Sequence, residues 1–260
     1  MRPEIIFNFM ERDFRISISY RTAFAGRLMG LVFLLGIFYY ISLSTDKPAY
    51  FPYILIGLAY TAIIRNSLFF LSNRIENEQI SGTIGYLFTS PFSTMEYLLG
   101  TSIYGLIMGW IEALVYIIAG IFIFNTPFTI DPAHLVNIIP AVLFGTLSLW
   151  GIGIIAASIT LVWKKGSSLS WLFTAGVIFS GNVFFQSDLL PEWFAWISRL
   201  NPAKYSLDII RHILSAGAIQ PGANDYIILI VLSFVFLGGG ILSFKTALKR
   251  VKKKGDLEHF

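Results

Sequence analysis

The chain has 260 residues, of which 55% are hydrophobic, 16% aromatic and only 13% charged, and its mean hydropathy is +0.70. Soluble domains carry about 25% charged residues, so this composition excludes a disordered chain, argues against a soluble enzyme and is typical of an integral membrane protein. The formal net charge of +4 indicates loops on anionic lipid rather than a nucleic-acid partner.

The first expected element is an amphipathic helix over residues 3–21. Four apolar residues recur at helical spacing there: Phe7, Met10, Phe14 and Ile18. A strand is the alternative, because residues 14–20 also alternate with period two. The membrane context favours the helix, which we expect to lie on the inner membrane face.

Six apolar runs follow, each read as a transmembrane helix, since a span needs about 20 mostly apolar residues. They cover roughly residues 28–44, 52–72, 97–124, 135–163, 169–185 and 226–244. The expected fold class is an all-α integral membrane protein forming a single transmembrane domain over residues 1–260. It consists of an interfacial helix (1–27), six spans (28–244) and a basic tail (245–260), which is interpreted equally as lying on anionic headgroups or as a stop-transfer charge cluster.

Lys and Arg residues set the orientation of these spans. With the N-terminus inside, most of the 19 basic residues fall on the cytoplasmic side. Both termini are therefore expected to be cytoplasmic. Ser93 and Glu96 predict a capping box at the start of the third span.

The polar stretch between the second and third spans, residues 73–93, predicts a short cytoplasmic helix. Apolar residues recur at helical spacing after Gly82: Ile84, Leu87 and Phe88. Ser90 and Pro91 end the pattern. We expect this helix to present a surface to a soluble partner; a simple connector is the alternative, against which its length and apolar face argue.

Two charged residues lie inside expected spans, where exposure to lipid would cost each several kcal/mol. Arg65 would lie about 10–12 Å from the inner end of its span, and Glu112 about 20–25 Å. These depths argue against a direct ion pair. Each could line a polar path or make a structural contact; the structural interpretation is favoured for Arg65, and both stay open for Glu112.

Between the fifth and sixth spans, residues 186–217 are too apolar for a free loop and too interrupted for a span. The break at Asn201-Pro202 predicts two short re-entrant helices in the outer leaflet.

The sequence contains no recognisable catalytic, cofactor or metal motif. It has no phosphate-binding loop of the GxxxxGK[ST] type, no HExxH and no Cys. An intramembrane hydrolase is disfavoured because His134 and His212 both fall in outside segments. We therefore expect no catalytic, cofactor-binding or metal-ligating residue in this chain.

Two stretches resemble motifs of a known family. Residues 77–91 resemble the E…GT…L…SP element of type-2 ABC exporter permeases, the membrane subunits of drug, lipo-oligosaccharide and polysaccharide exporters. Residues 190–211 are similar to the LP.W…NP..Y……R element that precedes the last helix in that family. The resemblance covers nearly the whole chain, with a departure at Gly85, near which the family often has a carboxylate.

The resemblance implies a permease subunit of an ATP-driven exporter in the cell's inner (cytoplasmic) membrane. It would form a homodimer or a heterodimer with a related permease, and separate soluble ATPase subunits would hold ATP and Mg and perform the hydrolysis. Spans one, two and five would line the path of an amphiphilic drug, lipid-linked or saccharide substrate. A non-ABC secondary transporter or a membrane assembly factor is the alternative.

The resemblance also assigns roles to residues. The residues expected to couple the permease to the ATPase are Glu76, Glu78, Gly82, Thr83, Ser90 and Pro91. The residues expected to form an outer gate are Asn201, Pro202, Tyr205 and Arg211, with Arg211 capping or pairing within it.

Overall fold

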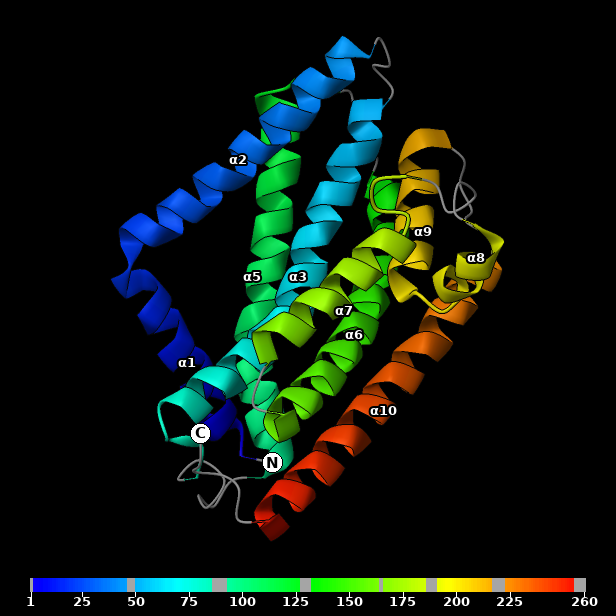
Figure 1. Ribbon diagram of the computed structural model, residues 1–260. Coiled ribbons are helices and arrows are strands. Elements are labelled where there is room, and N and C mark those ends of the chain that lie inside the picture. Colours follow the sequence, from blue (N-terminus) through cyan, green and yellow to red (C-terminus); the bar gives the residue numbers. More distant parts are fainter. Residues whose placement is uncertain are drawn as a thin grey trace.

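A computed structural model describes residues 2–45, 50–85, 93–126, 132–163, 166–185, 191–216 and 223–254, and helices make up nearly all of these ranges (Figure 1). In chain order the helices are α1 (Pro3–Ser19), α2 (Arg21–Ser44), α3 (Tyr50–Ile80), α5 (Thr94–Phe122), α6 (Pro132–Trp163), α7 (Gly166–Ser180), α8 (Glu192–Arg199), α9 (Pro202–Ala216) and α10 (Ala223–Lys254). These ranges contain no strand, which confirms the all-α fold class.

In the part of the chain that the structure describes, five helices are long and apolar enough to cross a membrane: α2, α3, α5, α6 and α10. The expected fifth span corresponds to α7, which has only 15 residues. That helix is about 22 Å long, shorter than a hydrocarbon core of about 30 Å. It ends at Ser180 because Asn182 takes a left-handed conformation with φ 58°, so residues 181–185 form a turn.

Two other boundaries differ from those that hydropathy indicates. The helix α3 continues past residue 72 to Ile80, and α10 continues through the basic tail to Lys254. On this extension of α10, Ala247, Leu248 and Val251 are buried against the C-terminal parts of α3 and α6 and the start of α5.

The core is built around α3, which packs against α5, α6, α7 and α9. By contrast, α2 runs obliquely to the other helices and comes nearest to α3 and α5 toward its C-terminal end (Figure 1). Only one edge of α2 is buried, through Leu31 and Leu35, while Phe33 and Ile37 remain exposed. This apolar exposure fits a lipid environment or a protein partner within the membrane.

The two ends of the bundle carry different elements. The start of α1 and the end of α10 lie at one end, where the ring of Tyr97 contacts the rings of Phe9 and Phe244. At the opposite end lie α8 and α9 (Figure 1). The structure confirms that α1 is a helix and that two short helices follow the fifth apolar run, with the break at Asn201.

The pairing of α6 with α10 depends on glycine. A Cβ at Gly151 would lie 2.6 Å from the backbone nitrogen of Leu237, and one at Gly240 would lie 2.6 Å from the carbonyl oxygen of Gly151. The two backbones therefore approach each other more closely than any side chain allows.

We expect Gly151→Ala to destabilise the protein by about 1–3 kcal/mol, because overpacking forces α6 and α10 apart. The matched control is Gly239→Ala on α10, where an added Cβ meets no atom within 4 Å. This control should be neutral or gain up to about 1 kcal/mol from helix propensity. Thermal unfolding in mild detergent measures both variants, and equal melting temperatures would contradict the close-packing argument.

Candidate functional site

The C-terminal end of α3 finishes in a defined helix cap. Gly82 has φ 68°, its N–H donates to the carbonyl of Gln79 over 3.1 Å, and the N–H of Thr83 donates to the carbonyl of Glu78 over 3.0 Å. These two bonds with a left-handed glycine form a Schellman motif. The Thr83 hydroxyl also donates to the Glu78 carboxylate. The cap sets the direction in which the chain leaves α3.

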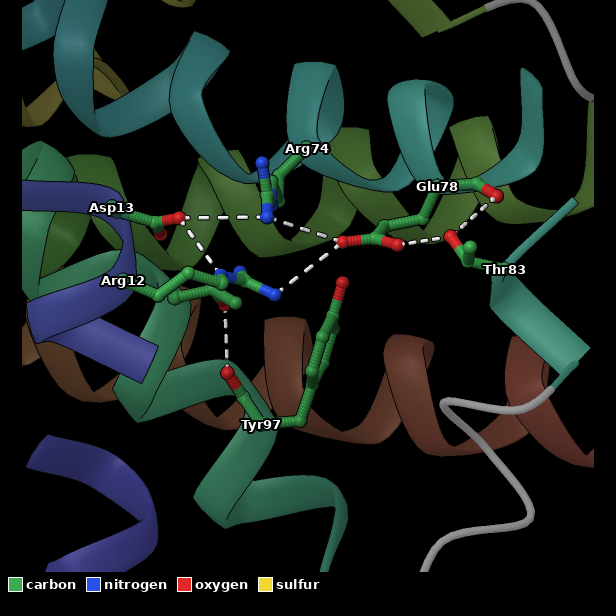
Figure 2. A network of polar contacts seen from close by, with 7 residues as sticks. Arg12, Asp13, Arg74, Glu78, Thr83 and Tyr97 are labelled. Carbon is green, nitrogen blue, oxygen red and sulfur yellow. Dashed lines mark hydrogen bonds and ion pairs between the residues drawn. The ribbon is translucent and has the colours of Figure 1, made fainter. Parts of the chain in front are cut away.

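Four charged side chains join this end of α3 to α1 (Figure 2). A nitrogen of Arg74 lies 3.3 Å from a carboxylate oxygen of Glu78 and 3.5 Å from one of Asp13. Arg12 lies 3.1 Å from Asp13 and 3.5 Å from Glu78. Two guanidinium groups thus balance two carboxylates, of which the Asp13 side chain is only 4% exposed. We call Arg12, Asp13, Arg74 and Glu78 the inner network.

The start of α5 is tied to α1 as well. The backbone N–H of Ser93 donates to the Glu96 carboxylate over 2.7 Å, and the N–H of Glu96 donates back to the Ser93 hydroxyl over 3.2 Å. This confirms the expected capping box. The backbone N–H of Arg2 donates to the same carboxylate over 2.6 Å.

The residues expected to couple to a partner divide into two groups. Glu76, Glu78, Gly82 and Thr83 lie together at the end of α3, with Glu78 inside the inner network and Gly82 and Thr83 exposed. Ser90 and Pro91, and most of the expected cytoplasmic helix, lie outside the described residues.

Arg65 and Glu112 form an ion pair, so the argument from their depths is wrong. The error arose from the assumed helix ends. Measured from Ile80 and Thr94, where α3 ends and α5 begins, Arg65 lies about 22 Å and Glu112 about 27 Å along their antiparallel helices. An arginine side chain readily covers this difference.

Arg27 at the start of α2 also pairs with Glu112. Its guanidinium donates to the side-chain carbonyl of Asn66 over 3.0 Å, and the Asn66 amide donates to the Glu112 carboxylate over 3.1 Å. Glu112 is fully buried, as expected for a carboxylate held by several donors. We call Arg27, Arg65, Asn66 and Glu112 the intramembrane cluster.

At the opposite end of the bundle, Arg211 on α9 holds the turn that follows α7. Its guanidinium donates to the carbonyls of Asn182, Val183 (2.7 Å) and Tyr53 (3.1 Å) and lies 3.5 Å from the centre of the Tyr53 ring. Burial lowers the pKa of Arg211 to about 10, so the group remains cationic at neutral pH. Burial also raises the pKa of Asp208, whose carboxylate accepts from Asn182 over 2.9 Å.

The other residues expected at an outer gate lie around this turn. Asn201 caps α9 by accepting from the N–H of Ala203 over 2.9 Å, and its amide donates to Val177 and Ser180 at the end of α7 over 2.8 Å. Pro202 occupies the first position of α9. The Tyr205 hydroxyl donates to the carbonyl of Arg199 over 2.8 Å and so holds α8 against α9.

Sequence reasoning missed several members of these groups. Arg12 and Arg27 were not among the expected site residues, although Arg12 contacts Glu78 on α3 and Arg27 pairs with Glu112. A usable signal was the spacing of Arg74 and Glu78, which places opposite charges four residues apart on one helix face. Asp13 offered no comparable pattern, because its partners come from a distant segment.

Comparisons with known proteins agree with this architecture. Residues 6–215 match the model of the family described as ABC-2 type transporter. The chain is also 24% identical over 139 residues to the probable multidrug ABC transporter permease YbhR of Escherichia coli K12, and equally to that of Escherichia coli O157:H7. The matched region is 54% of this chain and 37% of each relative, so the chain aligns with little more than a third of their length. Since the family model covers most of the multi-pass helical bundle, the chain belongs to the ABC-2 type transporter family of membrane permeases.

Proposed function

We propose that this permease is the membrane-spanning subunit of an ATP-driven exporter in the inner membrane, with both termini in the cytoplasm. ATP and Mg would bind to separate ATPase subunits that dock at the end of the bundle carrying the inner network. The permease would pair with a second copy or a related permease, and α8 and α9 would gate the outer end.

The observation that carries this proposal is the inner network together with the cap of α3. Charges on α1 and α3 balance in ion pairs between the two helices, which tie the end of α3 to α1. Displacement of the segment that leaves Gly82 would therefore be transmitted to α3, the most deeply packed helix of the bundle. A coupling surface needs this stiffness, because a flexible end would absorb the motion of an ATPase.

The proposal also includes a path for the substrate through the bundle. A cavity of about 540 Å³ lies between α2, α3 and α7, which are the three helices expected to line the path. Its lining combines polar groups with phenylalanine and tryptophan rings, as an amphiphilic substrate requires. The relatives are named as probable multidrug ABC transporter permeases, which supports this class of substrate.

Co-purification tests the proposed partner. The tagged chain is extracted gently from native membranes, and we expect a soluble subunit bearing a phosphate-binding loop to co-purify in stoichiometric amount. The Glu76→Ala/Glu78→Ala variant should insert normally but lose transport or retain less of this subunit. Glu192→Ala on α8 is the matched control at the outer end and should behave as wild type.

The alternatives predict a different outcome. A secondary transporter or an assembly factor would purify without an ATPase across several mild detergents, and the double variant would then leave transport unchanged. That pair of results would overturn the exporter proposal.

A further inference from the structure

The intramembrane cluster forms one wall of the cavity between α2, α3 and α7. Arg27, Arg65 and Asn66 line the cavity, joined by Thr61 from α3. Other parts of the lining are apolar and include Phe69 and Trp171. The cavity is therefore lined by positively charged groups and by apolar side chains.

The charges of this cluster do not balance. Two guanidinium groups share the single carboxylate of Glu112, which leaves a net charge of +1. The carboxylate is fully buried, whereas the side chains of Arg27 and Arg65 are 42% and 43% exposed. The Glu112 carboxylate is therefore enclosed within the protein, and the excess positive charge of the two arginines faces the cavity.

The arginines also have unused hydrogen-bonding capacity. Both pair with Glu112 through Nη2, and Arg27 uses the same nitrogen for Asn66. A guanidinium carries five N–H donors in a planar fork that matches a carboxylate or phosphate. Among the residues that the structure describes, the other donors of the two groups have no partner, so they are available to a ligand in the cavity that both residues line.

We propose that this cavity binds an amphiphile with an anionic head group, a phosphate or carboxylate, and an apolar tail. The head would pair with Arg27 and Arg65, and the tail would lie against Phe69 and Trp171. An uncompensated cation at this depth is costly, and an anionic ligand removes that cost, whereas a cationic one adds to it. This inference rests on the proposed function insofar as the ligand class is also the class of transported substrate. Binding of the ligand at this site can be tested without that function.

The test measures binding to the full chain alone in nanodiscs of phosphatidylcholine, without an ATPase. The probes are fluorescent lysophosphatidic acid and lysophosphatidylcholine with the same acyl chain, and empty nanodiscs correct for partitioning. We expect the anionic probe to bind at least about tenfold more tightly than the zwitterionic one.

Three variants separate the head group from the tail. Arg27→Gln leaves the Arg65–Glu112 pair in place. It should weaken binding of the anionic probe about tenfold and leave binding of the zwitterionic probe unchanged. Glu112→Gln raises the positive charge of the cluster and should tighten binding of the anionic probe severalfold. Trp171→Ala should weaken both probes by the same factor, since it alters only the apolar wall.

Equal binding of the two probes, or weaker binding of the anionic probe to Glu112→Gln, would overturn the proposal and leave the cluster a structural device. A second arm identifies the source of the anion in vesicles that contain the permease and its ATPase. ATP-dependent movement of lysophosphatidic acid identifies a transported substrate, while binding without movement identifies the head group of a resident bilayer lipid. Because the binding arm contains no ATPase, failure of the exporter proposal cannot be mistaken for failure of this site.

Discussion

A Gly82→Pro variant is expected to reach the membrane at the wild-type level and to lose nearly all substrate-stimulated ATPase activity of the proposed complex. Proline holds φ near −65° and has no N–H, whereas Gly82 has φ 68° and donates to Gln79. The cap of α3 would be lost and the following segment redirected. The helix itself ends at Ile80 and should persist, so insertion is not the step affected. ATPase activity and transport in proteoliposomes measure the effect.

Two milder substitutions at the same residue serve as controls. Gly82→Asn should retain coupling, because asparagine tolerates a positive φ and keeps the N–H. Gly82→Ala should fall between these extremes, with a local cost of about 1 kcal/mol. Wild-type transport by the proline variant would show that the direction of the chain after α3 does not carry the coupling.

The double variant Arg27→Gln/Arg65→Gln is expected to lose about 3–5 kcal/mol of stability. Its physical cause is Glu112, which is fully buried and would lose both of its ion-pair partners. Removing one partner of a buried ion pair lowers the free energy of unfolding more than removing both partners does. Thermal unfolding of the protein in phosphatidylcholine nanodiscs measures the loss.

Adding Glu112→Gln to the double variant should restore most of that stability, because no buried charge then remains. A triple variant as unstable as the double one would show that lost arginine packing, and not an uncompensated carboxylate, causes the effect. The matched surface control is Arg15→Gln, whose side chain is 78% exposed and pairs with Glu11 one turn away. This change should alter stability by no more than about 0.5 kcal/mol.

Local sequence patterns predicted those features that short segments determine by themselves. The helical spacing of apolar residues was compatible with α1, and the membrane context favoured this helix over a strand, while the proline at 202 marked the break between α8 and α9. The capping box of Ser93 and Glu96 followed from the spacing of two residues. Each of these features is stabilised by contacts within a few residues, so the sequence alone contains its cause.

Hydropathy was less reliable for the ends of helices. The fall in hydropathy at Asn73 was taken as the end of a helix, but α3 continues for two further turns because no helix breaker occurs before Gly82. The fifth apolar run was judged long enough to span, but a left-handed Asn182 ends α7 early. Solvent preference and backbone conformation are separate properties, and only the first is read from hydropathy.

The sequence by itself determined that this protein is a helical membrane bundle, because composition and apolar runs fix how much of the chain must avoid water. It also singled out Arg65 and Glu112 as charges inside the expected spans, although it argued against an ion pair between them. Only the tertiary structure decided which residues pair with one another. Arg27 on α2 and Asn66 on α3 contact Glu112, and Asp13 on α1 pairs with Arg74 on α3. The reason is that a buried charge is stabilised by whichever opposite charge the packing of distant helices brings within a few ångströms, and that distance is a property of the whole bundle.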